Sequence, residues 1–213
     1  MFTELLAREE CRRDSYKLLS ECYYLPEENL LSRLGSLDRS RGELFSEITQ
    51  RIPQLTDMES LQIDFSGLFV GPYVLLAPPY GSVYLENKRM VMGESTLDVI
   101  SQYKDEELDI GIKEAPDHIA IELEFMYFLI FREIEAIRNG QYDDAVKFLA
   151  KEKAFLTHHL STWVPDFTDN IKKHAQTKFY QDLAHLTDSF VLKDLETVSD
   201  DSIIDVLRVR LEV

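Results

Sequence analysis

The chain has 213 residues, of which 45% are hydrophobic and 29% charged, so it carries enough apolar material for a sizeable core. Eight glycines and seven prolines are few for a β-sandwich, a barrel or a glycine-rich loop that binds phosphate. The 23 basic and 39 acidic residues give a formal net charge of −16, which argues against nucleic acid as a partner, because phosphate binding requires a basic surface. The acidity suits a cationic peptide or protein, although it also serves solubility alone.

The N-terminal part has the hydrophobic spacing of helices. A first helix is expected to end before Pro26, and it places Cys11 and Cys22 about three turns apart on one face, as buried thiols rather than a disulfide or a metal site. Short helices are expected at 28–35 and 41–52. The helix that follows has an inner face formed by Met58, Leu61, Phe65, Leu68 and Phe69.

The helical pattern then stops, and segment 71–94 is expected to form a long ordered loop. It is longer than most connections and too apolar for a disordered one. Pro78 and Pro79 stiffen its middle, and Tyr80 and Tyr84 offer rigid apolar faces with polar tips, as binding surfaces often do. Such a loop either docks on the core as a lid or presents a surface to a partner.

Helical spacing returns after the loop. Ser95 or Thr96 is expected to cap a helix, and Pro116 to lie in the first turn of a central helix that ends at Gly140. That central helix is apolar nearly all round, which predicts that it is buried. A further helix is expected to stop at Pro165, with another opening directly after it.

These patterns predict an all-α protein: residues 1–213 form a single-domain helical bundle of about ten helices, with the loop 71–94 between two helical halves. The acidic tail 195–213 ends in LRVRLEV, which fits a helix, an edge segment or an arm that reaches another subunit. No apolar run approaches the roughly 20 residues of a membrane span, and the charged start MFTELLAREECRRD lacks the core of a signal peptide. A cytoplasmic location is expected.

Two histidine-containing motifs are candidate chemical sites. Asp117 in the first turn of the central helix would complement the helix dipole, a sufficient structural reason for an acid there. Together with His118 it could form an acid–base pair, but no nucleophile motif of the G-x-S-x-G or H-E-x-x-H type accompanies it. His158 and His159 are adjacent on a helix and point about 100° apart, a poor arrangement for one metal ion. Neither a metal nor a cofactor is expected.

A series of spaced motifs covers residues 64–192: L-F-x-G-P, A-P-P-Y-x-S-V-Y, G-x-S-T, P-D-H-I-x-x-E-L-E-F-M, W-x-P-x-F and a final F-Y pair. This series resembles the TorD/DmsD family of redox-enzyme maturation chaperones, which serve molybdenum-containing oxidoreductases. The resemblance implies an all-helical protein that binds the twin-arginine signal peptide of a partner apoenzyme until the cofactor is inserted. It places the signal-peptide-binding surface at Leu68, Phe69, Pro79, Tyr80, Tyr84, Gly93, Asp117 and His118.

The partner implied is thus the apo-form of a molybdopterin oxidoreductase subunit. Its signal offers two arginines followed by an apolar, helix-prone stretch. Asp117 is the expected arginine partner, and the apolar stretch is expected in a groove lined by Leu68, Phe69, Tyr80 and Tyr84. An affinity near micromolar, on the order of −8 kcal/mol, is expected. Alternatives are a general helical interaction scaffold and, with less support, a cytosolic enzyme using Asp117 and His118. The chain is expected to be a monomer or a domain-swapped dimer.

Overall fold

The computed structural model describes residues 2–30, 32, 34, 57–71, 74–86, 93–108, 114–200, 203, 204 and 207. All regular structure in these residues is helical, apart from one isolated antiparallel bridge between Tyr80 and His118. The prediction of an all-α protein is confirmed. The helix expected at 28–35 is described only at residues 28–30, 32 and 34. The helix expected at 41–52, and LRVRLEV apart from Leu207, lie outside the described residues, so the total of about ten helices stays a prediction.

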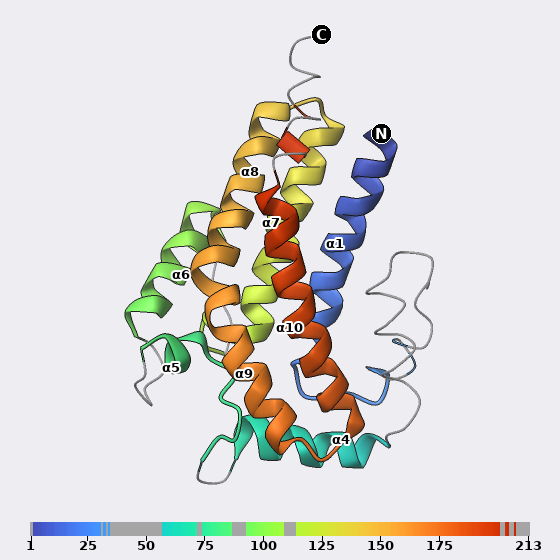
Figure 1. Ribbon diagram of the computed structural model, residues 1–213, viewed down its shortest axis with the longest axis vertical. Helices are drawn as coiled ribbons and strands as arrows, with labels where there is room; N and C mark the ends of the chain where they lie inside the picture. The colour runs from blue at the N-terminus through green and yellow to red at the C-terminus, as the bar shows by residue number, and fades with distance from the viewer. Residues whose placement is uncertain are drawn as a thin grey trace.

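Four long helices form the body of the molecule (Figure 1): α1 (Phe2–Cys22), α7 (Ile119–Arg138), α8 (Tyr142–Phe155) and α10 (Lys178–Ser199). A π-helical turn, η4 (Leu156–Leu160), leads from α8 into α9 (Ser161–His174), which packs along α10. The short α5 (Gly81–Leu85) contacts both α9 and α6 (Glu94–Asp105). Helix α4 (Met58–Phe65), extended by a second π-helical turn, η3 (Ser66–Val70), lies across the lower end of the body in Figure 1.

Helix α7 is the central element, as its all-round apolar sequence predicted. It packs against α1 and α8, and most of its residues are buried. It begins later than expected, because His118 is the N-cap: its Nδ1 accepts a hydrogen bond from the Ala120 N–H at 3.1 Å. Pro116 therefore lies in the turn before the helix. The helix ends at Arg138, and Gly140 follows with φ of 72°, as a helix-terminating glycine does.

Two local predictions are wrong. Pro165 does not end a helix but lies inside α9, directly downstream of the π-helical turn η4. A proline removes one backbone donor and crowds the preceding turn, and the wider π-helical turn accommodates this without a break. The cap of α6 is neither Ser95 nor Thr96 but Gly93, and the Glu86 carboxylate accepts the Ser95 N–H at 3.0 Å instead.

Segment 71–94 is not one continuous loop, because it contains helix α5. It departs from η3 at Gly71, whose φ of 50° suits glycine, and a Cβ there would lie 2.7 Å from the Val74 carbonyl oxygen. The Ala77 N–H then donates to the Leu68 carbonyl at 2.9 Å, which holds the start of the segment against η3. The segment is therefore attached to the core on one side.

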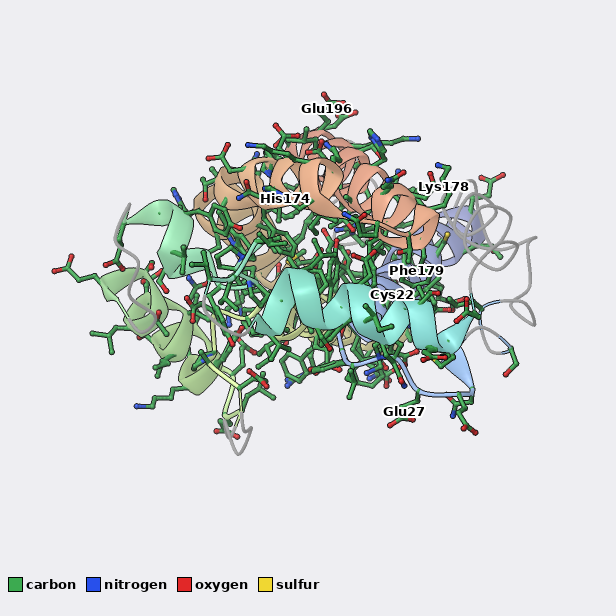
Figure 2. All side chains as sticks on the ribbon, turned by 90° about the horizontal axis from the view of Figure 1, so that it is seen from below. Cys22, Glu27, His174, Lys178, Phe179 and Glu196 are labelled. Carbon is green, nitrogen blue, oxygen red and sulfur yellow. The ribbon has the colours of Figure 1, made fainter. Side chains whose placement is uncertain are left out.

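An aromatic cluster joins η3 to the body of the molecule. Phe69 lies 5.1 Å from Phe65, 5.5 Å from Tyr180 and 6.1 Å from Tyr23, measured between ring centroids. Such edge-on pairs add to the free energy gained from apolar burial. Phe65, on α4, also lies 6.5 Å from Tyr180, on α10, so this cluster connects the bundle with the crossing helix α4, which runs across the front of Figure 2.

Between α1, α7, α8 and α10 lies a buried charged cluster around Arg12. Its guanidinium donates to Asp194 Oδ1 at 2.6 Å and to Glu152 Oε2 at 2.9 Å, and it pairs with Glu9 as well. Glu133 is buried beside them. Burial, together with neighbouring carboxylates, raises the pKa of Glu152 to about 8 and raises the pKa of Glu133 well above its ordinary value.

Candidate functional site

The two motif segments predicted to form the site meet in the structure. Tyr80 and His118 form the antiparallel bridge: the Gly81 N–H donates to the Asp117 carbonyl at 2.9 Å, and the Ile119 N–H donates to the Pro79 carbonyl at 2.9 Å. Segments almost forty positions apart in the sequence are thus joined by main-chain hydrogen bonds. We call this junction, residues 79–82 with 117–119, the bridge site.

Asp117 holds the bridge site together from inside. Its side chain is 1% exposed, and its Oδ2 accepts the Ser82 N–H at 2.8 Å, at the start of α5. The other oxygen, Oδ1, is buried without a protein partner among the described residues. The expected role, direct pairing with an arginine of a partner, does not fit a carboxylate so placed. Its hydrogen bond to the Ser82 N–H instead fixes α5 to the start of α7.

His118 lies between two aromatic rings. Tyr24, just beyond α1, stacks on the imidazole at 6.2 Å, and Tyr80 meets it edge-on at 5.4 Å. Burial lowers the pKa of His118 to about 4, although the carboxylates of Glu114 and Asp117 act in the opposite direction. The imidazole is therefore neutral near pH 7 and caps α7, which disfavours the acid–base role considered for it.

The outer face of the bridge site is formed by Tyr80. Its ring is partly exposed, and its hydroxyl donates to Glu114 Oε2 at 3.3 Å. Burial, and next the charge of Glu114, raise the pKa of Tyr80, so it remains a neutral hydroxyl. Upstream in the same segment, Val74 is 60% and Leu76 40% exposed. The segment thus carries exposed aliphatic side chains a few positions before a partly exposed tyrosine that is bonded to a carboxylate.

Tyr84 is predicted for the same surface but belongs to its support. Its ring stacks on Trp163 at 5.6 Å, and its hydroxyl accepts from Asn170 at 3.4 Å. Trp163 is fully buried and donates to the Glu122 carboxylate at 3.0 Å, a carboxylate whose pKa burial raises well above its ordinary value. A Cβ on Gly81 would lie 3.1 Å from the Trp163 indole nitrogen, so any other residue would require the indole to shift by a few tenths of an ångström.

The remaining predicted residues are divided between core and turns. Leu68 is fully buried, Phe69 is 5% exposed, and Pro79 is buried, so none of the three lines an open groove. Gly93 is the N-cap of α6, where an added Cβ would overlap the Glu86 carboxylate. Among the predicted residues Tyr80, Tyr84 and Gly93 are thus partly exposed, and the others are buried.

Several residues of the site were not predicted. Tyr24, which follows the end of α1, contacts His118, and Glu114 accepts a hydrogen bond from the Tyr80 hydroxyl. Glu114 belongs to the run EAPDH, and an acid three positions before Asp117 could have indicated that it also belongs to the site. Nothing in the sequence around Tyr24 indicates that it reaches a residue almost a hundred positions away, since only the packing of α1 on α7 brings the two together.

Two wider features concern metals and membranes. Within the described residues no group of three or more His, Cys, Asp or Glu side chains is placed to hold a metal ion. His159 is buried and bonded to Asp98 at 2.8 Å and to Gln102 at 3.0 Å, whereas the adjacent His158 is exposed. None of the described helices is long and apolar enough to cross a membrane.

Comparison with known proteins agrees with this arrangement. The model of the nitrate reductase delta subunit family matches residues 34–169. The Tat proofreading chaperone DmsD of Salmonella typhi is 33% identical over 131 residues, which are 60% of this chain and 57% of DmsD. The chaperone protein TorD of Vibrio parahaemolyticus is 25% identical over 200 residues, 91% of this chain and 89% of TorD.

A solved structure shows the same fold. A candidate redox enzyme maturation protein of Archaeoglobus fulgidus superposes with a TM-score of 0.58 at 22% identity, over 84% of this chain and 93% of that protein. Fold, site and relatives together define a helical chaperone rather than an enzyme. The chain belongs to the TorD/DmsD family of redox-enzyme maturation chaperones.

Proposed function

We propose that this chaperone binds the twin-arginine signal peptide of a molybdenum-containing oxidoreductase precursor and holds the apo-form until its cofactor is inserted. The observation that carries the proposal is the bridge between Tyr80 and His118, which makes one surface from the two motif segments. The relative DmsD of Salmonella typhi is a Tat proofreading chaperone, which supports the same activity. Such a chaperone acts in the cytoplasm, where a precursor is found before export.

The contact surface proposed here includes the predicted loop but differs in its residues. The apolar stretch of the signal would lie against Tyr80 and the exposed Val74 and Leu76. Leu68 and Phe69 support this surface from the core rather than touching the peptide. An apolar peptide gains free energy from the aliphatic area it covers, and Tyr80 adds a rigid ring with a polar tip.

Co-purification tests the proposal. The chain is co-expressed with a precursor that carries its own leader, with the same precursor whose arginine pair is Ala-Ala, and with a leaderless form. We expect retention of the first and loss of the other two. Equal retention of all three would instead support a general interaction scaffold, because such a scaffold has no reason to depend on the leader.

Variants of the surface refine this test. Leu76→Asp places a charge in the proposed apolar contact and is expected to reduce retention at least fivefold, since a buried unpaired carboxylate is costly. Leu97→Asp is the matched control, because Leu97 is 63% exposed on α6 outside the proposed surface. A normal yield with Leu76→Asp, in a protein that remains folded, would exclude the surface around Tyr80.

A further inference from the structure

A small pocket lies beside the bridge site, where the end of α1 and the turn after it meet the first turns of α7. Its volume is about 270 Å³, below the usual range for sites that enclose a drug-sized ligand or a cofactor. It is therefore sized for one or two side chains of a partner. It is lined by Lys17, Glu21, Tyr24, Leu25, Glu27, Asn29, Leu30 and Glu124.

The charges of this pocket are unbalanced. It has three carboxylates, on Glu21, Glu27 and Glu124, and one cation, Lys17, so its formal charge is −2. Lys17 Nζ lies 2.8 Å from Glu124 Oε1 and 4.0 Å from Glu21 Oε1. The pocket thus already holds one cationic group of the chain itself, and it retains an excess of two negative charges.

Tyr24 connects this pocket to the bridge site. Its hydroxyl donates to Glu124 Oε2 at 3.5 Å, and its ring stacks on His118 at 6.2 Å. Burial, and next the charge of Glu124, raise the pKa of Tyr24 to about 12, so its hydroxyl is neutral near pH 7. A cation in this pocket could therefore contact an aromatic ring as well as carboxylates.

We propose that this pocket binds the guanidinium groups of the signal's arginine pair. The inference rests on the proposed function and assigns the arginines to Glu21, Glu27 and Glu124 in place of the buried Asp117. The excess of two negative charges equals the charge of two arginines. A guanidinium pairs with a carboxylate through two parallel hydrogen bonds and stacks on a tyrosine, which a lysine ammonium cannot do equally well.

The experiment measures the affinity of labelled synthetic signal peptides by fluorescence anisotropy. The peptides share one apolar stretch and carry Arg-Arg, Lys-Lys or Ala-Ala. For the wild-type chain we expect the Arg-Arg peptide to bind at least tenfold tighter than Ala-Ala, with Lys-Lys between them. A Lys-Lys peptide that binds as tightly as Arg-Arg would overturn the assignment to a carboxylate pocket that favours the guanidinium fork.

The decisive variant is Glu27→Gln/Glu124→Gln, which makes the pocket formally neutral. We expect it to lose about tenfold or more for Arg-Arg while Ala-Ala is bound as before. The control, Glu135→Gln/Glu196→Gln, removes the same charge from other surfaces and should change neither affinity. Figure 2 shows Glu27 and Glu196 at opposite edges of the molecule. Thermal unfolding checks that each variant is folded.

Removing the positive charge of the pocket should strengthen binding of the Arg-Arg peptide, whereas removing its carboxylates should weaken it. Lys17→Met removes the resident cation and keeps an apolar stem, so we expect the Arg-Arg peptide to bind a few-fold tighter. Lys153→Met, exposed on α8, is the control and should leave the affinity unchanged.

If wild type prefers Arg-Arg but the pocket variants bind as wild type does, only the pocket assignment fails. If wild type shows no preference for Arg-Arg, the signal-peptide proposal and this inference fail together.

Discussion

His118 illustrates at the scale of one residue how a histidine next to an acid has a structural role. An imidazole nitrogen that accepts the Ala120 N–H cannot carry a proton, and burial adds a further cost to protonation. The same ring contacts Tyr24 and Tyr80, so its neutral state keeps the bridge site in place. The P-D-H run therefore holds the bridge site together through the cap of α7 and the contact of Asp117 with α5.

His118 should make the chain less stable in mild acid. Its pKa is about 4 in the folded state and about 6.5 in the unfolded state, so between these values the unfolded chain binds a proton that the folded chain does not. The free energy of unfolding therefore falls as the pH drops from 6.5 to 4, by up to about 1.4 kcal/mol per pH unit. His118→Asn keeps a capping oxygen but does not titrate, so its urea-denaturation curves should lack this decline.

Wild type and His118→Asn are compared at half-unit pH steps, with the fluorescence of the chain's single tryptophan, Trp163, as the probe. The stability of wild type relative to the variant should decrease steadily below pH 6.5. Parallel stability curves would show that His118 is protonated equally in both states and would contradict the buried, capping role.

Gly71 offers a second test at this scale. Gly71→Ala forces a side chain onto a φ of 50° and within 2.7 Å of the Val74 carbonyl, so a loss of about 1–3 kcal/mol is expected. Gly67→Ala is the matched control: nothing lies within 4 Å of its added Cβ, and alanine in a helix favours the folded state by roughly 0.5–1 kcal/mol. Urea denaturation of both proteins measures the difference, and equal effects would contradict this geometry.

The two motif segments that the sequence predicted to form the site meet at the bridge site. Tyr80 is partly exposed there, but Leu68 and Phe69 are core residues, because in an aromatic-rich helix end the same side chains suit a groove or an interior. Asp117 could not be recognised as buried, since its partner is the Ser82 N–H, a main-chain group that leaves no trace in the sequence. Which of the motif residues touch a peptide stays a prediction.

At the scale of elements, the helix class and the central position of α7 followed from hydrophobic spacing, and its end followed from Gly140. The exceptions have local causes. Helix α5 has only five residues, too few for a periodic hydrophobic pattern that would predict it. It is held in place by Asp117 and by packing on α9. Proline normally ends a helix, and the π-helical turn that lets α9 contain Pro165 has no sequence signature of its own.

The buried cluster around Arg12 links four helices and predicts a pH effect opposite to that of His118. Glu133 and Glu152 have raised folded-state pKa values, so above the unfolded value near 4.3 the folded chain holds protons that the unfolded chain releases. Stability due to these groups is present below that pH and is lost as the pH rises, by up to about 1.4 kcal/mol per unit for one proton.

Glu133→Gln replaces one of these carboxyls by a neutral group of the same shape. Relative to wild type, the variant should gain stability steadily between about pH 5 and 8, because it has no proton to lose. Glu135→Gln, two positions along α7 and not buried, is the control for the loss of one carboxylate from the same helix. The measurement is a series of urea-denaturation curves, and a pH-independent difference for Glu133→Gln would contradict the buried, protonated state.

At the scale of the whole molecule, an acidic chain of net charge −16 presents a surface that attracts a cationic signal. Binding of an Arg-Arg peptide should therefore weaken as the salt concentration rises from 0.05 to 0.5 M, since salt screens partly exposed charges. The loss should be severalfold for Arg-Arg and small for an Ala-Ala peptide, whose binding is mainly apolar. A salt effect of the same size for both peptides would show that the arginines make no ionic contact.

The most direct test of the account is calorimetric titration of the wild-type chain with one twin-arginine signal peptide and its Ala-Ala variant. The account predicts saturable one-to-one binding of the Arg-Arg peptide with a dissociation constant near micromolar, on the order of −8 kcal/mol, and binding of Ala-Ala at least tenfold weaker. Equal affinity for the two peptides, or no heat from either, would contradict it.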